Sequence, residues 1–143
     1  MKKSKLFLAA LASLITSSMA SKTYDDMVFA EDLPTDAKSF VQKFFPRHSV
    51  AFAEMDIRPY NSEYKVSLND GTEINFNFFG EWSAVDCKFN AVPLNIIPDA
   101  IAQYADHRFP GSQIVAIHNE EFGYKVKLSN GITLTFNQHG ELV

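Results

Sequence analysis

Alternation of apolar and polar residues predicts a β-hairpin between residues 64 and 78. Tyr64, Val66 and Leu68 fall on one side of an extended strand, and polar residues separate them. Asp70-Gly71 follows, a pair typical of two-residue hairpin turns because both central positions need positive φ. Residues 74–78 then alternate again, which completes the hairpin.

The same hairpin occurs a second time further along the chain. Residues 64–71 read YKVSLNDG and residues 124–131 read YKVKLSNG. The pairs Phe76-Asn77 and Gly80-Glu81 recur as Phe136-Asn137 and Gly140-Glu141. Both copies must bury equivalent apolar positions, so they are expected to share one fold.

One helix is predicted ahead of each hairpin. In the first copy, apolar residues recur at the spacing of one helix face, at Ala37, Phe40, Val41 and Phe44. Pro34 suits the start of that helix, where its missing N–H would lack a partner anyway, and Pro46 ends it. In the second copy, Pro98 and Pro110 bound the equivalent helix.

Further strands are expected at residues 50–57, 81–87 and 114–119, with a short last strand before the chain ends at Val143. The sequence therefore predicts an α+β fold: a tandem duplication of a helix plus a four-stranded antiparallel meander. Because the apolar sheet face needs cover and the two helices are available for it, we expect one eight-stranded antiparallel sheet with both helices on one face.

Segment boundaries follow from this reading. The first copy spans residues 33–87, a linker spans 88–96, and the second copy spans 97–143. The polar stretch 21–32 is an N-terminal leader, either disordered or a strand-like arm.

Residues 1–20 have the features of a cleavable signal peptide. Lys2, Lys3 and Lys5 precede a short apolar run, and Ser18-Met19-Ala20 forms a small-x-small cleavage site. Cleavage after Ala20 predicts a periplasmic or secreted protein that does not stay inserted in a membrane. The chain has 13 Lys+Arg and 17 Asp+Glu, so losing the three lysines leaves 10 against 17, a net charge of −7. This balance argues against nucleic acid as a partner.

Catalytic and metal-binding patterns are not found in the sequence. The four histidines, His48, His107, His118 and His139, show no metal-ligand spacing. No nucleophile elbow or phosphate-binding loop is present, so we expect no cofactor, no metal and no enzymatic activity. Cys87, the single cysteine, is interpreted as a small buried residue, with a reactive thiol as the alternative.

The polar face of the predicted sheet supplies candidate binding residues: Lys65, Asn75, Asn77, Lys125, Lys127 and Asn137. Trp82 has two readings, because the second copy has Leu142 in its place. It packs in the core, or it is an exposed anchor of the kind enriched at binding hot spots.

The spacing of the two copies differs between their first and second strands. The helix end matches at an offset of 64 (46 to 110) and the hairpin at an offset of 60 (64 to 124), so the first copy carries four extra residues. Arg58 and Tyr60 lie in this longer loop. Loops vary without structural cost, but Arg and Tyr are also favoured in recognition surfaces.

Several segments together resemble the PepSY-like family of exported bacterial proteins, also described as β-lactamase-inhibitor-like. They are Trp82-Ser83-Ala84-Val85-Asp86-Cys87, Val92-Pro93, Ile97-Pro98, Phe109-Pro110-Gly111, Tyr124–Gly131 and Phe136-Asn137-Gln138-His139-Gly140. The resemblance covers residues 33–143 and implies a tandem helix-plus-meander fold with a concave sheet. Members are mostly of unknown function, and no inhibitory residue can be carried over to this chain.

Three functions remain open from the sequence. The first is a non-catalytic exported module that presents an open polar sheet face and loops to an unknown exported protein or peptide. The alternatives are an inhibitor of an exported hydrolase and a small-ligand or ion-binding periplasmic protein.

Overall fold

The computed structural model describes residues 26–143. The predicted signal peptide, its cleavage site after Ala20 and the start of the leader lie outside these residues. The strands are β1 (Met27–Val28), β2 (Val50–Asp56), β3 (Glu63–Leu68), β4 (Glu73–Asn77), β5 (Trp82–Asp86), β6 (Ile114–Glu120), β7 (Gly123–Leu128) and β8 (Thr133–Asn137). The helices are α2 (Thr35–Phe44) and α3 (Asp99–Arg108), with short 3-10 turns η3 (Ala30–Asp32) and η4 (Leu94–Ile96).

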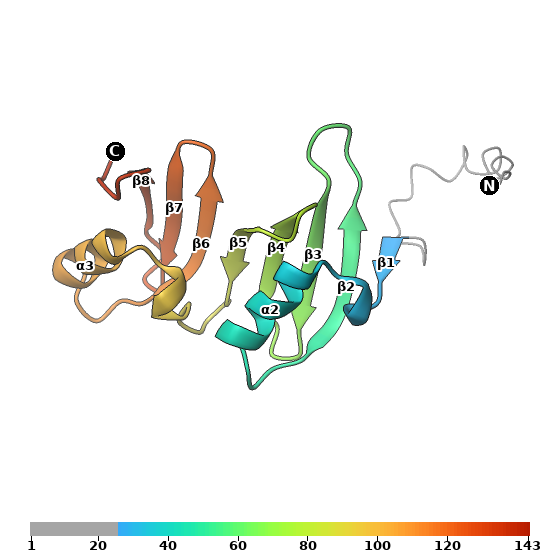
Figure 1. The fold of residues 1–143 in the computed structure, drawn as a ribbon. Coiled ribbons are helices and arrows are strands. Elements are labelled where there is room, and N and C mark those ends of the chain that lie inside the picture. The colour runs from blue at the N-terminus through green and yellow to red at the C-terminus, as the bar shows by residue number, and fades with distance from the viewer. Residues whose placement is uncertain (1–25) are drawn as a thin grey trace, which may run out of the picture.

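All eight strands form one antiparallel sheet in chain order, which confirms the predicted fold class (Figure 1). The number of strands that each segment contributes to the sheet differs from the expectation. The first copy contributes β2 to β5, but the second contributes only β6 to β8, and its fourth strand is reduced to a single bridge between Phe136 and Leu142. The leader supplies the remaining strand, since Met27 and Val28 pair with Glu54 and Ala53.

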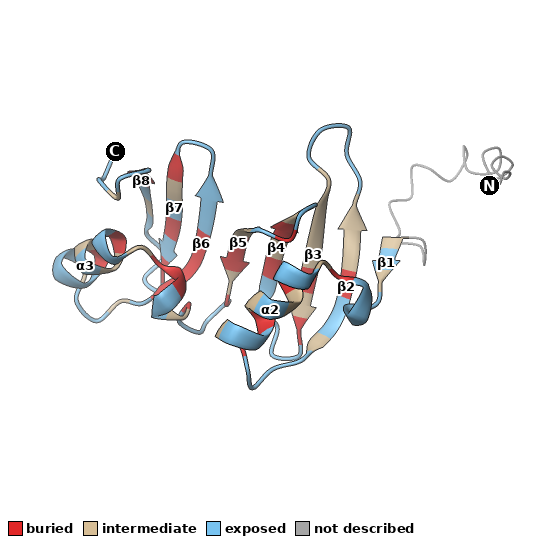
Figure 2. Ribbon diagram, viewed as in Figure 1, coloured by how far each residue is buried: buried red, intermediate tan, exposed pale blue. Residues whose placement is uncertain are grey.

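One apolar row crosses the whole sheet. Residues that lie directly opposite each other from β1 to β8 are Val28, Ala53, Val66, Ile74, Val85, Ile117, Val126 and Leu134. Directly opposed side chains share a sheet face, so this row defines what we call the helix face. Its members from β2 to β7 are buried in a single core that spans both copies (Figure 2).

Both helices pack on this same face, as predicted. In α2, Phe40 meets Phe76 edge-on, with the ring centroids 5.4 Å apart. In α3, Tyr104 meets the equivalent Phe136 in the same way at 5.6 Å. Each helix is preceded by a proline, Pro34 or Pro98, and each ends just before a buried or half-buried phenylalanine. The duplicated sequence therefore gives the same helix-on-sheet contact twice.

Candidate functional site

The opposite face of the sheet, here called the open face, is polar and carries no helix in residues 26–143 (Figure 1). One row of directly opposed residues on it is Glu54, Lys65, Asn75, Ala84, His118, Lys125 and Thr135. A neighbouring row includes Glu73, Asp86, Ala116 and Lys127. The structure thus places Lys65, Asn75, Lys125 and Lys127 together on this face, from both copies.

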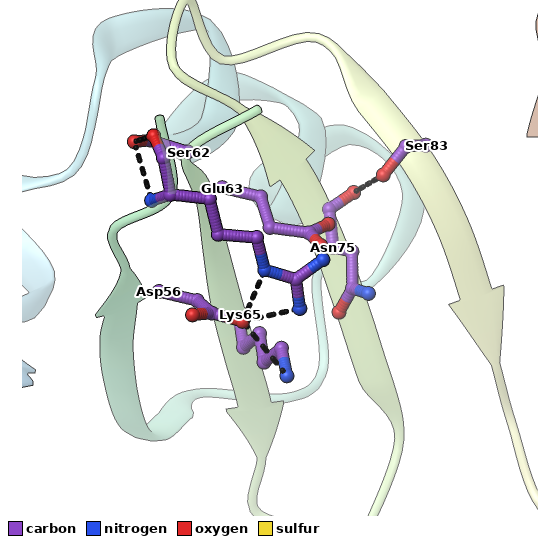
Figure 3. Close-up of polar contacts among 7 residues, drawn as sticks. Asp56, Ser62, Glu63, Lys65, Asn75 and Ser83 are labelled. Atoms are coloured by element: carbon purple, nitrogen blue, oxygen red, sulfur yellow. Dashed lines mark hydrogen bonds and ion pairs between the residues drawn. The ribbon is translucent and has the colours of Figure 1, made fainter. Parts of the chain in front are cut away.

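Ion pairs hold most of the charges of the open face. Asp56 Oδ2 lies 2.6 Å from Arg58 Nη2 and 3.5 Å from Lys65 Nζ. Arg58 Nη1 also lies 3.9 Å from Glu63 Oε2, and Figure 3 shows Asp56, Glu63 and Lys65 side by side on the strands. The hydrogen bonds from Arg58 lower the pKa of the Asp56 carboxyl below its ordinary value. A partner that contacts these groups meets charges that are already balanced.

The second copy repeats this arrangement with a shorter loop. Lys125 Nζ lies 3.9 Å from Glu120 Oε2, in the place of the Lys65–Asp56 pair. Residues 57–62 separate β2 from β3, whereas only residues 121–122 separate β6 from β7. This difference confirms the four extra residues. Within the longer loop, the Ser62 hydroxyl accepts a hydrogen bond from Arg58 N and donates one to Arg58 O.

Asn77 and Asn137, two of the candidate binding residues, close the turns that follow β4 and β8. Asn77 Oδ1 accepts hydrogen bonds from the backbone N–H groups of Phe79 and Glu81, and its Nδ2 donates to Glu81 Oε1 at 2.8 Å. Asn137 makes the equivalent three bonds in the second copy. Both amide atoms are engaged within a turn, so these side chains shape the two turns.

Trp82 is partly buried and packs against the core on the helix face, so the core-packing reading is confirmed and the reading as an anchor on the open face is wrong. Its backbone pairs with Phe76, and its ring lies 6.2 Å from that of Phe40. The physical reason is a β-bulge, a register shift of β5 against Asn75 and Phe76. Simple alternation would put Trp82 on the side of Ala84, but the extra residue at Ser83 turns it toward the helix. Figure 3 shows the Ser83 hydroxyl bonded to Asn75 O, at 3.3 Å.

Apart from Tyr60, sequence reasoning missed a group of exposed apolar side chains at one end of the sheet. Connections of an antiparallel meander alternate between its two ends, so the β2–β3, β4–β5 and β6–β7 connections share one end, called here the loop end (Figure 1). Its large apolar side chains and their exposed fractions are Ile57 75%, Tyr60 95%, Phe78 56%, Phe79 75% and Phe122 79%. The available signal was apolar residues at turn positions, where polar residues prevail.

Two titratable groups outside these surfaces, His48 and Cys87, are respectively held by a carboxylate and buried. Within residues 26–143, no group of three or more His, Cys, Asp or Glu side chains could hold a metal ion. His48 is held by Asp70, with Nε2 and Oδ2 3.5 Å apart. Cys87 is buried, which raises the pKa of its thiol to about 11. No helix in this part of the chain is long and apolar enough to cross a membrane.

Comparison with known proteins gives a family and solved relatives. A family model described as beta-lactamase-inhibitor-like, PepSY-like matches residues 62–143. A candidate periplasmic protein of the DUF2874 family from Bacteroides vulgatus is 32% identical, with a TM-score of 0.79 over 85% of this chain and 97% of its own. No curated protein matches the chain.

Two more solved structures are similar. A candidate calcium-regulated periplasmic protein from Bacteroides thetaiotaomicron is 31% identical, with a TM-score of 0.80 over 82% of this chain and 93% of its own. A second candidate periplasmic protein from Bacteroides vulgatus, described as of unknown function, is 34% identical, with a TM-score of 0.78 over 80% and 92%.

Proposed function

The chain belongs to the PepSY-like, beta-lactamase-inhibitor-like family, and on that premise we propose that it is an exported, non-catalytic module that binds a protein or peptide. The solved relatives are described as periplasmic proteins, and this supports the same location for the present chain.

The observation that carries the proposal is the one-sided cover of the sheet. Both helices pack on the helix face, and the open face extends across the strands of both copies without a helix in residues 26–143. The duplicated scaffold therefore offers one largely polar surface that spans the strands of both copies. Such a surface suits recognition of another macromolecule better than enclosure of a small substrate.

The residues of this surface differ in what they can contribute. Arg58, Lys65 and Lys125 are engaged in ion pairs within the chain, and solvent-exposed pairs of this kind contribute little net energy. Tyr60 is almost fully exposed, and Lys127 has no ion pair within residues 26–143. We therefore expect Tyr60 to supply buried apolar area on binding, and the paired charges to supply orientation.

The test is affinity capture from the native exported fraction, with the protein starting at Ser21 as bait. A variant with Arg58→Ala, Tyr60→Ala and Lys125→Ala is run beside it. A matched control carries Arg108→Ala, Phe89→Ala and Lys43→Ala. It also removes two positive charges and one exposed aromatic ring, but from outside the strands of the open face. The expected result is a partner that the wild type and the control retain and the first variant loses. After purification, this partner should bind the wild type again.

Capture of the same partner by all three proteins would refute the assignment of this surface. Inhibition of an exported hydrolase is one form that binding can take, and activity assays on a captured hydrolase address it. The relative described as calcium-regulated makes calcium an additional variable, so the capture is run with calcium and with chelator.

A further inference from the structure

We propose that the loop end is a docking site for a partner segment in which Arg or Lys stands beside an aromatic or aliphatic residue. This inference rests on the proposed binding function and names the surface and the partner chemistry within it. The loop end comprises residues 57–62, 78–81 and 121–122, between the strands of three successive hairpins.

Of the exposed apolar side chains of the loop end, here called the apolar patch, Phe78 and Phe79 are held in place by ring contacts. The Phe78 ring stacks on Tyr64, with centroids 6.4 Å apart, and meets Phe79 edge-on at 5.9 Å. Phe79 and Phe122 remain about three-quarters exposed or more. Soluble proteins rarely gather large apolar side chains in solvent without an interaction that covers them. Rings that are already ordered also lose little conformational freedom on binding.

The second copy shows that the turn itself does not require aromatic residues. Its turn has the same asparagine and glycine framework, Asn137 with Gly140, but polar residues at the two positions between, Gln138 and His139. Gln138 Nε2 donates to Glu121 O at 2.7 Å instead of lying free in solvent. Phe78 and Phe79 therefore add exposed apolar surface that the local fold does not need.

Negative charge adjoins this patch on the helix side. A cavity of about 630 Å³ lies between the β4–β5 and β6–β7 turns and the start of α2. Four carboxylates, of Asp36, Glu81, Glu120 and Glu121, line it, and no basic side chain does. The side chains of Asp36 and Glu121 have no ion pair or hydrogen bond within residues 26–143. We call this cavity the acidic cleft.

Two aromatic rings, Phe40 and Trp82, also line the acidic cleft. A guanidinium or ammonium group inserted there would meet ring faces and carboxylates together, a combination that favours cations by charge attraction and cation–π contact. The apolar patch and the acidic cleft share the two turns that carry Phe79 and Phe122. One short segment with neighbouring apolar and basic side chains can therefore occupy both.

The same carboxylates disfavour the rival occupant, a membrane surface. Exposed aromatic loops can insert into lipid, but anionic lipid headgroups would be repelled by the acidic cleft. The experiment therefore includes lipid as a separate arm.

The test starts with a random-peptide display library selected on the immobilised protein starting at Ser21. We expect enriched peptides to share Arg or Lys next to an aromatic or aliphatic residue. A synthetic consensus peptide is then titrated against the emission of Trp82, which is the only tryptophan of the chain and lines the acidic cleft. Replacing its Arg by neutral citrulline should weaken binding roughly tenfold, the scale of one desolvated cation–π contact with its ion pair.

Two variants test the two parts of the surface. Asp36→Asn with Glu121→Gln should lower the affinity for the peptide by about tenfold. Phe79→Ser with Phe122→Ser should lower it by about tenfold or more. Matched controls are Glu31→Gln with Asp106→Asn, and Phe89→Ser, which removes a still more exposed ring at the opposite end of the sheet. Both controls should bind as the wild type does.

Three results would overturn the inference: no enriched peptide, enriched peptides without a basic residue, or titrations that the loop-end variants leave unchanged. Binding to vesicles of zwitterionic or anionic phospholipid that is lost with Phe79→Ser and Phe122→Ser would assign the patch to lipid instead. The open-face variant for this comparison is Lys65→Ala with Lys127→Ala, because Arg58 and Tyr60 of the triple variant lie in the loop end and its Lys125 pairs with Glu120 of the acidic cleft. A native partner lost by this pair of substitutions and held by both loop-end variants would leave the proposed function standing while this inference fails.

Discussion

Cys87 illustrates at the residue scale how burial changes chemistry. Its side chain is 3% exposed and lies beside Thr72 and Asp70. Removal from water disfavours the thiolate and raises the pKa of the thiol from its ordinary 9.0 to about 11. The sequence-based interpretation of a small buried residue is confirmed by its low exposure. The raised pKa keeps the thiol protonated at neutral pH, so the thiolate needed for nucleophilic attack is scarce.

This shift predicts a loss of stability in alkaline solution. The unfolded chain loses the thiol proton near pH 9.0, whereas the folded chain keeps it until about pH 11. The free energy of unfolding therefore falls as pH rises through this window, by up to about 3 kcal/mol, and is unaffected below it. Urea unfolding of the wild type and Cys87→Ala across the window measures this. The variant should lack the extra slope, and parallel pH profiles would contradict the prediction.

At the element scale, the turn after β4 fixes the position of α2. Asn77 closes this turn with three hydrogen bonds, and Gly80 at its end approaches the first residues of the helix. The second copy repeats the contact between Gly140 and Ala100 of α3. Each helix is therefore held over the sheet by a turn as well as by its apolar face.

Substitutions at two glycines distinguish the cost of backbone strain from the cost of crowding against the helix. Gly71 and Gly80 have nearly the same φ, +93° and +92°, but a Cβ on Gly80 would lie 2.9 Å from Pro34 Cβ, whereas one on Gly71 has nothing within 4 Å. We expect Gly71→Ala to cost about 1–2 kcal/mol from left-handed strain, and Gly80→Ala to cost roughly 1–2 kcal/mol more. Urea unfolding compares them. Equal losses of unfolding free energy in the two variants would show that a Cβ at position 80 is not crowded by the helix.

At the scale of the whole molecule, the two copies share one core. β5 and β6 join them through three register pairs, and the central pair, Val85 with Ile117, is fully buried. The apolar row continues through this junction from β1 to β8. We therefore expect the two copies to unfold together as one cooperative unit.

Ile117→Ala tests this cooperation. The fully buried side chain leaves a cavity, which should cost about 2–4 kcal/mol. Although Ile117 belongs to the second copy, we expect the emission of Trp82 in the first copy and the far-ultraviolet circular dichroism to shift to the same lower urea midpoint. Ile132→Ala, at a more exposed position of the second copy, should cost less than about 1 kcal/mol. A Trp82 midpoint that stays at the wild-type value would mean that the copies unfold separately.

Local sequence patterns were sufficient to predict most elements of the fold. The alternation around Val66 and Val126, the helical spacing of Ala37 and Val41, and the bounding prolines predicted the hairpins, the helices and the shared sheet face. The four-residue difference between the copies located the longer loop of Tyr60. These features depend on neighbours within a few positions, so periodicity and turn chemistry are enough to reveal them.

The tertiary structure decided what depends on contacts between distant segments. A bulge opposite Asn75 turned Trp82 to the helix face, and pairing with β2 made a strand of Met27 and Val28. The meander brought Phe79 and Phe122 to one end of the sheet, beside the carboxylates of Asp36 and Glu121. Register and the gathering of loops are set by pairing and packing across the whole chain, and no local pattern records them.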